Sequence, residues 1–175
     1  IHDLAPNPET TVVVNCAGRT RSIIGAQSLI NAGVPNRVVA LENGTMGWHL
    51  AGFELERGQR RNFNEVSPDA LVVAEMRAAM VRDRFEVPVT DHAQVSTWLK
   101  DPTRTTYLLD VRDPAEFQQA HLPGSKSSPG GQLVQATDLY VGVRRARMVL
   151  IDDTGVRASM SASWLIQMGW HDVHV

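Results

Sequence analysis

The hydrophobic pattern at the start of the chain predicts two parallel strands joined by a helix. Three consecutive valines within residues 11–15 predict a strand that is buried on both faces, as in a parallel sheet. Apolar residues then recur at helical spacing over 23–30, and Gly33 stands where such a helix would end. Residues 37–41 predict the second strand, which completes a β-α-β unit. A glycine-rich turn is expected over 43–48.

A longer helix is predicted in the middle of the chain. Ser67 is a suitable N-cap, Pro68 suits the first helical position, and residues 69–84 carry the helical pattern. The expected buried stripe of this helix consists of Val72, Val73, Met76, Met80 and Val81. Residues 60–66, just before it, are polar. We expect the helix to link two modules.

The second module begins near Phe85. Its predicted elements are a helix over 91–99, a strand over 107–111, a helical turn over 113–117, a strand over 147–151 and a helix over 162–168. Residues 121–125 predict a sharp loop, and residues 127–131 have the composition of a flexible segment.

The two modules share one register. An offset of 136 positions brings Cys16 onto Asp152 and aligns strand, loop and helix without a gap. The identical pairs at this offset are Val13 and Val149, Arg21 and Arg157, Ala26 and Ala162, Leu29 and Leu165, Ile30 and Ile166, and Gly33 and Gly169. This agreement predicts a duplication in which the two loops differ chemically.

The repeat also predicts that both modules are incomplete. Val175 matches Val39, in the middle of a strand, and the first module has no counterpart of residues 85–147. Because the sequence also begins with Ile1 rather than Met, we expect a piece of a longer protein. Unpaired strand edges are unfavourable, so the incomplete halves could pair with each other or with another copy of the chain. Strands 11–15 and 147–151 would then compete for one place.

The expected organisation has three parts. The carboxyl-terminal half of one module covers residues 1–63, a linker helix covers 64–84, and a second module, cut short at its carboxyl end, covers 85–175. Hydrophobic residues make up 43% of the chain, which is enough for a packed core.

Composition excludes several classes of protein. The net charge of −2 argues against a basic nucleic-acid-binding face. Cys16 is the only cysteine, so an internal disulfide or a cysteine-rich zinc site cannot form, and the chain fits a reducing compartment. No apolar run approaches the length of a membrane span, and no signal-peptide pattern is present. We therefore expect a cytoplasmic protein with no membrane partner, no cofactor and no metal.

Cys16 lies between a predicted strand and a predicted helix, at the sheet edge where α/β proteins bind ligands. The helix N-terminus offers unpaired backbone N–H groups, and Gly18 lets the loop curl so that they converge. Arg19 and Arg21 add positive charge. These three effects favour the thiolate and lower the pKa of Cys16. The loop therefore predicts a nucleophile, or a carrier of a charged group, in an anion cradle.

The residues of this loop resemble those of a known family. Residues 16–22, Cys-Ala-Gly-Arg-Thr-Arg-Ser after a valine-rich strand, resemble the active-site loop of the rhodanese sulfurtransferases. Residues 44–48 resemble the glycine and tryptophan turn near the end of that domain. In the second module, residues 109–117 and 121–125 closely resemble the early signature of the family. The chain is similar to the junction between consecutive domains of a multi-rhodanese protein.

The resemblance implies a three-layer α/β fold, with a parallel sheet between helices, in tandem modules of which at least one is truncated. It also implies a sulfur-transfer cycle in which the Cys16 thiolate takes the outer sulfur of thiosulfate or a similar donor. A thiol or cyanide then removes this sulfur from the persulfide. Backbone N–H groups of Ala17, Gly18, Arg19, Thr20, Arg21 and Ser22 would stabilise the persulfide, and Arg19 and Arg21 would orient the anionic donor.

Alternatives remain open at this point. Four residues separate Cys16 from Arg21, and related phosphatases carry a loop one residue longer, so the resemblance favours sulfur transfer over phosphatase or arsenate reductase chemistry. The chain could instead be a non-catalytic interaction or regulatory module. In the second module Asp152 replaces the cysteine and Asp153 adds negative charge, which predicts that this module is catalytically inactive.

Three further side chains of the second module are expected to be structural. Asp110 and Arg112 are best satisfied by each other, and His121 is expected to be a hydrogen-bonded turn residue.

Overall fold

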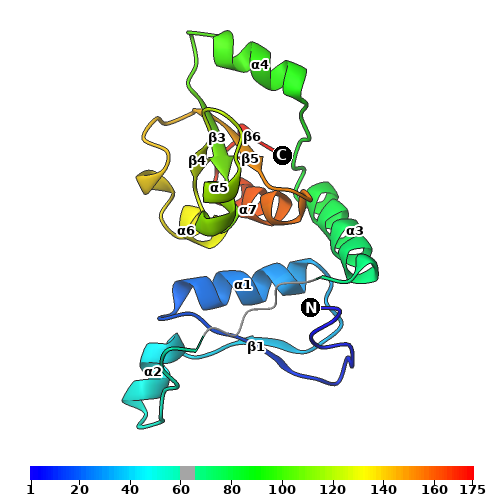
Figure 1. Cartoon of the computed structure of the whole chain (residues 1–175), viewed down its shortest axis with the longest axis vertical. Coiled ribbons are helices and arrows are strands. Elements are labelled where there is room, and N and C mark those ends of the chain that lie inside the picture. Colours follow the sequence, from blue (N-terminus) through cyan, green and yellow to red (C-terminus); the bar gives the residue numbers. More distant parts are fainter. Residues whose placement is uncertain (60–65) are drawn as a thin grey trace. The chain divides into compact units, whose positions relative to one another are not determined.

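The computed structural model describes residues 1–59 and 66–175, which form two compact units. The first unit covers residues 1–77 and the second covers residues 78–175 (Figure 1). The expected boundary between residues 63 and 64 lies outside the described residues, so the predicted domain limits stay predictions.

The first unit contains the predicted β-α-β arrangement. Strand β1 (Val12–Val14) and strand β2 (Val38–Ala40) are parallel, with Val12 opposite Val38, and helix α1 (Thr20–Asn31) connects them. The prediction of burial on both faces of β1 was wrong. Val14 faces α1, but Val13 is 54% exposed, because successive side chains of a strand point to opposite faces and α1 packs on one of them.

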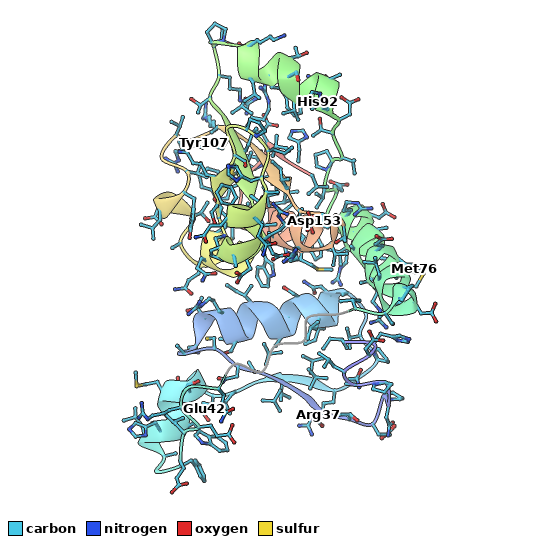
Figure 2. All side chains as sticks on the ribbon, viewed as in Figure 1. Arg37, Glu42, Met76, His92, Tyr107 and Asp153 are labelled. Atoms are coloured by element: carbon cyan, nitrogen blue, oxygen red, sulfur yellow. The ribbon has the colours of Figure 1, made fainter. Side chains whose placement is uncertain are left out.

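The expected turn over 43–48 is instead the start of a short helix, α2 (Gly44–Leu50). Asn43 and Gly44 both have left-handed backbone angles, with φ of 53° and 59°. The chain therefore turns sharply after β2 and enters the helix at once, which explains why the glycine content indicated a turn. Arg37 and Glu42 flank β2 in Figure 2.

Helix α3 (Pro68–Arg84) starts where the sequence predicted, and the division between the two units falls within it. The hydroxyl of Ser67 accepts a hydrogen bond from the backbone N–H of Ala70 at 3.2 Å, as an N-cap should. The predicted buried stripe was wrong in part. Val81 is buried, but Met76 is 56% exposed and stands away from the helix (Figure 2).

Small residues explain this error in α3. Its buried positions are Ala70, Ala78 and Val81, whereas Val72, Met76 and Met80 are exposed. A pattern based on large apolar residues therefore selected the wrong face, since alanine allows close packing without standing out in the sequence.

The second unit is built around a four-stranded parallel sheet in the order β4-β3-β5-β6. Its strands are β3 (Thr106–Asp110), β4 (Lys126–Ser127), β5 (Arg147–Ile151) and β6 (Val173–His174). Its helices are α4 (His92–Lys100), α5 (Pro114–Gln119), α6 (Gly130–Gln135) and α7 (Val156–Gln167), with a 3-10 turn η1 (Thr137–Leu139). The predicted parallel sheet with flanking helices is confirmed (Figure 1).

The core of the second unit is formed by side chains of the sheet, chiefly from β3 and β5, together with α6 and α7. Its fully buried side chains include Leu109, Leu133, Met148, Leu150 and Leu165. The segment expected to be flexible, residues 127–131, is ordered: Ser128 is buried, and its backbone N–H donates to the carbonyl of Asp110 at 2.8 Å. Pairing with β3 overrides the flexible composition of this segment.

The predicted offset of 136 positions relates one helix of each unit in the structure. Helix α1 covers residues 20–31 and helix α7 covers 156–167, so the same offset of 136 relates both ends. Gly33 and Gly169, just beyond these helices, both have positive φ values of 68° and 90°. In each unit the loop, residues 15–19 or 152–155, therefore lies between a parallel strand and a helix. Within the described ranges, no helix is both long and apolar enough to cross a membrane.

Candidate functional site

Cys16 lies at the carboxyl end of β1 and just before α1, as the sequence predicted. Its thiol is free and partly exposed. The carboxyl ends of parallel strands are where α/β proteins bind ligands. The position therefore suits a side chain that must react with a molecule from solution.

The sulfur of Cys16 accepts a hydrogen bond from the hydroxyl of Ser22, with 3.1 Å between Oγ and Sγ. Ser22 itself is fully buried. The pKa of Cys16 is lowered chiefly by this hydroxyl, and further by the backbone N–H groups of Gly18 and Ser22 and the charge of Arg21, against a raising effect of burial. The site thus favours a thiolate over a thiol.

Helix α2 is hydrogen-bonded to the backbone of the cysteine loop. The backbone N–H groups of Thr45 and Met46 donate to the carbonyls of Cys16 and Ala17 at 2.9 and 3.0 Å. The Thr45 hydroxyl donates to the Cys16 carbonyl at 3.3 Å and accepts from the side-chain amide of Asn15 at 3.1 Å. Sequence reasoning missed Thr45, because only a turn was expected there, and it missed Asn15, which was assigned to the end of the predicted strand.

Gly44 is required at the contact between α2 and the loop. A Cβ atom at this position would lie 2.0 Å from the carbonyl oxygen of Gly18 and 2.3 Å from that of Cys16. Its φ of 59° is also in the left-handed region that favours glycine. No larger residue fits without moving the backbone of the cysteine loop.

The other predicted site residues differ in their position and exposure around Cys16. Arg21 is half-buried in the first turn of α1, and Arg19 is exposed at its N-cap. Thr20 begins the helix, and Ala17 meets α2 through its carbonyl. Among these predicted residues, Gly18, Arg21 and Ser22 are the ones that act on the Cys16 sulfur in the described part of the chain.

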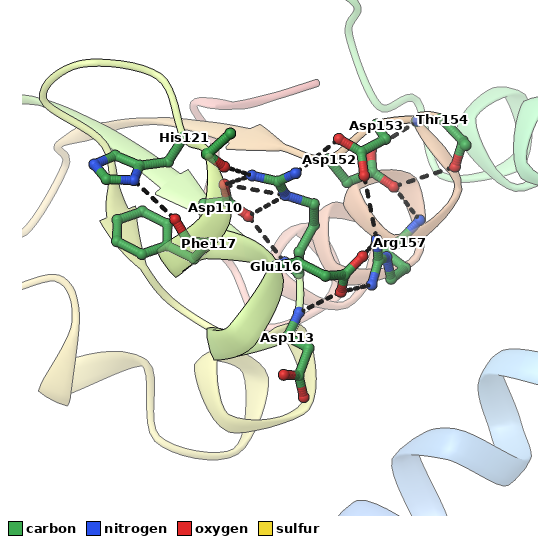
Figure 3. Close-up of polar contacts among 12 residues, drawn as sticks. Asp110, Asp113, Glu116, Phe117, His121, Asp152, Asp153, Thr154 and Arg157 are labelled. Atoms are coloured by element: carbon green, nitrogen blue, oxygen red, sulfur yellow. Dashed lines mark hydrogen bonds and ion pairs between the residues drawn. The ribbon is translucent and has the colours of Figure 1, made fainter. Parts of the chain in front are cut away.

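The equivalent loop of the second unit is filled by its own side chain. The carboxylate of Asp152 accepts hydrogen bonds from the backbone N–H groups of Gly155 at 2.7 Å and Arg157 at 2.9 Å (Figure 3). The hydroxyl of Thr154 donates to it at 3.4 Å. The donors that could have held a bound anion are therefore directed at a carboxylate of the protein.

A charged network surrounds this second loop (Figure 3). The guanidinium of Arg112 binds buried Asp110 with Nη2–Oδ2 at 2.7 Å, binds Asp153 at 2.8 Å, and donates to the carbonyl of Ala120 at 2.6 Å. The expected pairing of Asp110 with Arg112 is confirmed. The pKa of Asp110 is lowered because hydrogen bonds and charge from Arg112 outweigh the raising effect of burial.

Arg157 and Glu116 form the other strong pair of this network. Their Nη1–Oε2 and Nη2–Oε1 distances are 2.6 and 2.8 Å, a bidentate contact. This arginine holds the pKa of Glu116 at about 2. The Nδ1 atom of His121 lies 2.8 Å from the carbonyl oxygen of Phe117, to which it donates a hydrogen bond, as expected for a turn residue.

Comparison with known families identifies the second unit. The profile of the rhodanese-like domain matches residues 91–175. Residues 91–175 belong to the rhodanese-like family. The early signature of the family, in residues 109–117 and 121–125, is thus the part of the sequence that supplies Asp110, Arg112 and Glu116 to the charged network.

Solved structures of this family include a close relative. The crystal structure of a thiosulfate sulfurtransferase from Pseudomonas aeruginosa is 60% identical, with a TM-score of 0.94, over 99% of this chain and 33% of that one. The present chain thus spans about a third of the length of that protein. A 3-mercaptopyruvate sulfotransferase structure from Escherichia coli is 19% identical over 95% of this chain and 66% of that one, with a TM-score of 0.40. No curated protein matches the sequence.

Proposed function

We propose that this chain is a rhodanese-type sulfurtransferase in which Cys16 carries the transferred sulfur. The observation that carries the proposal is the sulfur of Cys16, which is hydrogen-bonded by Ser22 and has a lowered pKa at the carboxyl end of a parallel strand. The relative from Pseudomonas aeruginosa, 60% identical over 99% of this chain, supports it, since that protein is a thiosulfate sulfurtransferase.

The proposed reaction has two displacements. The Cys16 thiolate attacks the outer sulfur of thiosulfate or a similar donor, the bond between the two donor sulfurs breaks, and sulfite leaves with the electron pair. A persulfide anion remains on Cys16. Cyanide or a thiolate then attacks the outer persulfide sulfur, which forms thiocyanate or a new persulfide and releases the Cys16 thiolate. No second cysteine exists in this chain, so the acceptor comes from outside it.

The loop stabilises negative charge in each state of this cycle. The Ser22 hydroxyl and the N–H groups of Gly18 and Ser22 act on the Cys16 sulfur, and we expect the N–H groups of the loop from Ala17 to Ser22 to stabilise the persulfide. The positive charges of Arg19 and Arg21 would attract the anionic donor. We place this reaction in the cytoplasm, where a single free cysteine stays reduced.

The second unit has a different proposed role. Its Asp152 cannot form a persulfide, and its carboxylate already uses the N–H groups of the loop. We therefore assign this unit a non-catalytic role, in supporting the fold or in interaction.

The test is thiocyanate formation from thiosulfate and cyanide, for the chain as it stands and for Cys16→Ser. The proposal requires activity that the substitution abolishes. A folded chain without activity, or activity that survives in Cys16→Ser, would contradict it. Hydrolysis of an aryl phosphate that depends on Cys16 would instead favour the phosphatase alternative.

A further inference from the structure

A pocket of about 670 Å³ lies at the amino-terminal end of the sheet in the second unit. Its lining includes Arg104, which precedes β3, and Arg144 and Arg145, which precede β5. Trp170, just beyond α7, also lines it. Asp152 follows the carboxyl end of β5, so the pocket and the second loop lie at opposite ends of this strand. A volume of this size is typical of sites that bind small molecules.

The positive charge of this pocket exceeds its negative charge. The carboxylate of Asp172, which also lines the pocket, lies 2.6 Å from Nη1 of Arg104 and 3.6 Å from Nε of Arg147. The side chains of Arg144 and Arg145 are exposed, and within the part of the chain that the structure describes they make no hydrogen bond or ion pair. Both of these guanidinium charges are therefore unpaired at the pocket.

Arg104 is held in place by other groups of the pocket. Its Nε and Nη2 atoms donate to the backbone carbonyl of Arg145 at 3.1 and 3.0 Å, and its Nη1 atom pairs with Asp172. These bonds do not use all five N–H donors of the guanidinium, and the side chain is 39% exposed, so donors remain for a ligand. Arg145 has a φ of 64°, a left-handed conformation that is strained for a residue other than glycine. Such strain is kept where the surrounding structure maintains it, as at binding sites.

The first unit shows that the fold does not require this charge. At the offset of 136 positions, Pro8 and Glu9 stand where the second unit has its two unpaired arginines, and Val34 stands where it has Trp170. The backbone N–H groups of Val34 and Trp170 donate to equivalent carbonyls of the preceding helices, at 3.2 and 3.0 Å, so the two positions also match in the structure. The positive pocket is thus a feature of the second unit alone.

We propose that this pocket binds a small molecule that carries two linked phosphate groups. The planar fork of a guanidinium donates parallel hydrogen bonds to phosphate oxygens. A phosphate accepts hydrogen bonds from several directions, whereas a carboxylate accepts them near one plane. The donors here come from two segments of the chain, before β3 and before β5, which favours phosphate. Because Arg144 and Arg145 leave two charges unpaired, two linked phosphates match the pocket better than one.

This site goes beyond the sulfur transfer proposed for Cys16 and does not rest on it. The loop of the second unit is closed by the carboxylate of Asp152. Binding at the other end of the sheet would give this unit a ligand of its own without a reactive loop.

The test is calorimetric titration of the full chain with inorganic diphosphate, in a low-salt buffer free of phosphate. Diphosphate should bind at least about tenfold more tightly than inorganic phosphate, and added salt should weaken the binding. Arg144→Ala should lower the affinity about tenfold. Arg37→Ala is the matched control, because Arg37 is also an exposed arginine just before a strand, in the first unit, and its loss should leave the affinity unchanged.

Arg145→Gly separates binding from folding. Glycine suits the φ of 64° and keeps the carbonyl that holds Arg104, while the guanidinium is lost. The affinity should fall about tenfold, whereas the midpoint of thermal unfolding should not fall.

Trp170 reports where the ligand binds, since it lines the pocket. Diphosphate should change the tryptophan fluorescence of the wild-type chain, and Trp170→Phe should remove this change. A change that persists in Trp170→Phe would place the ligand elsewhere and overturn the inference.

The remaining outcomes also decide the matter. A folded chain that does not bind diphosphate, or equal losses of affinity in Arg144→Ala and Arg37→Ala, would overturn the inference. Citrate that binds as tightly as diphosphate would overturn the assignment to phosphate. Binding should be unchanged in Cys16→Ser, whose loss of sulfur uptake tests the sulfurtransferase proposal alone.

Discussion

The loops at Cys16 and Asp152 sit at equivalent places and hold different anions. Each follows a parallel strand and precedes a helix of twelve residues, and each directs backbone N–H groups inward. In one, the sulfur of Cys16 meets a buried hydroxyl and remains partly exposed. In the other, the carboxylate of Asp152 takes the donors itself. In both loops the backbone N–H groups favour a negatively charged side chain, and the proposed difference in reactivity rests on the exchange of cysteine for aspartate.

The support around the two loops differs as well. Helix α2 donates two backbone hydrogen bonds to the cysteine loop, and its glycine approaches the loop carbonyls closely. The Asp152 loop is instead surrounded by salt bridges from Arg112 and Arg157. The cysteine loop is thus held through its backbone, whereas the acidic side chains of the Asp152 loop are paired with arginines or with the loop's own N–H groups.

Substitution of Gly44 should produce the largest change. In Gly44→Ala the new methyl group would meet the carbonyls of Cys16 and Gly18, so the loop or α2 must move. We expect a loss of about 3 kcal/mol in stability and a fall of at least about 100-fold in sulfur uptake. Gly52→Ala is the control, because Gly52 also has a positive φ, of 85°, but has no atom near its Cβ position. Equal losses in both variants, by thermal unfolding and mass spectrometry, would show that the close contact is unimportant.

Introduction of a cysteine at position 152 should give the second loop some capacity for sulfur uptake. In a Cys16→Ser chain, Asp152→Cys would place a thiol before the N–H groups of Gly155 and Arg157. Asp153, with 59% of its side chain exposed, still repels an anionic donor. This repulsion of about 1 kcal/mol should make sulfur uptake about five- to tenfold slower than at Cys16.

Addition of Asp153→Ala should recover much of that rate. The contradicting result would come from the variant that still carries Asp153. If its new thiol at position 152 took up sulfur as fast as Cys16 does, the charge of Asp153 would have no effect on the rate. Mass spectrometry over time after addition of thiosulfate measures both rates.

Ser22→Ala tests how the loop stabilises the thiolate. The Ser22 hydroxyl is the main cause of the lowered pKa of Cys16, so its removal should move that pKa up toward the ordinary range. Because only the thiolate is alkylated, the rate with iodoacetamide at neutral pH should fall several-fold, and its pH midpoint should rise. Ser28→Ala is a suitable control, since the Ser28 hydroxyl donates to the carbonyl of Ile24 on the same helix. An unchanged midpoint in Ser22→Ala would contradict the account.

The smallest effect is expected from the salt bridge of the second loop. The pKa of Glu116 falls from 4.5 to about 2 through Arg157, so the pair stabilises the fold fully above about pH 4.5. This contribution is lost as the pH falls from about 4.5 to about 2. Glu116 and Arg157 have 37% and 43% of their side chains exposed, which limits the contribution to about 1 kcal/mol or less. Glu116→Gln should lower the free energy of unfolding at pH 7 by this amount and flatten its acid dependence, as measured by urea unfolding.

Much of the fold was predictable because local pattern and tertiary structure agree. The strand at 147–151 and the helix from Pro68 lie where the sequence placed them, and the offset of 136 aligns α1 with α7. The exposure of Val13 was not predictable, since a run of valines indicates a strand but not the number of elements that cover it. Helix α2 was not predicted, because its glycines indicated a turn. In the structure Gly44 instead allows α2 to approach the cysteine loop closely.

The residues nearest the Cys16 sulfur were predictable from the sequence. Cys16, Gly18, Arg21 and Ser22 were found from their order after a strand. The contribution of Thr45 and Asn15 was missed, because it depends on α2 folding back over the loop from about 30 positions away. The hydrogen bonds that close the Asp152 loop were also missed, since the sequence indicates a charge but not where its oxygens point.

The most direct test of the account is the intact mass of the chain after incubation with thiosulfate. The account predicts a gain of one sulfur atom, about 32 Da, that cyanide or a reductant reverses and that Cys16→Ser lacks. A wild-type chain shown to be folded but unchanged in mass would contradict the claim that Cys16 carries sulfur, and so would an equal gain in Cys16→Ser.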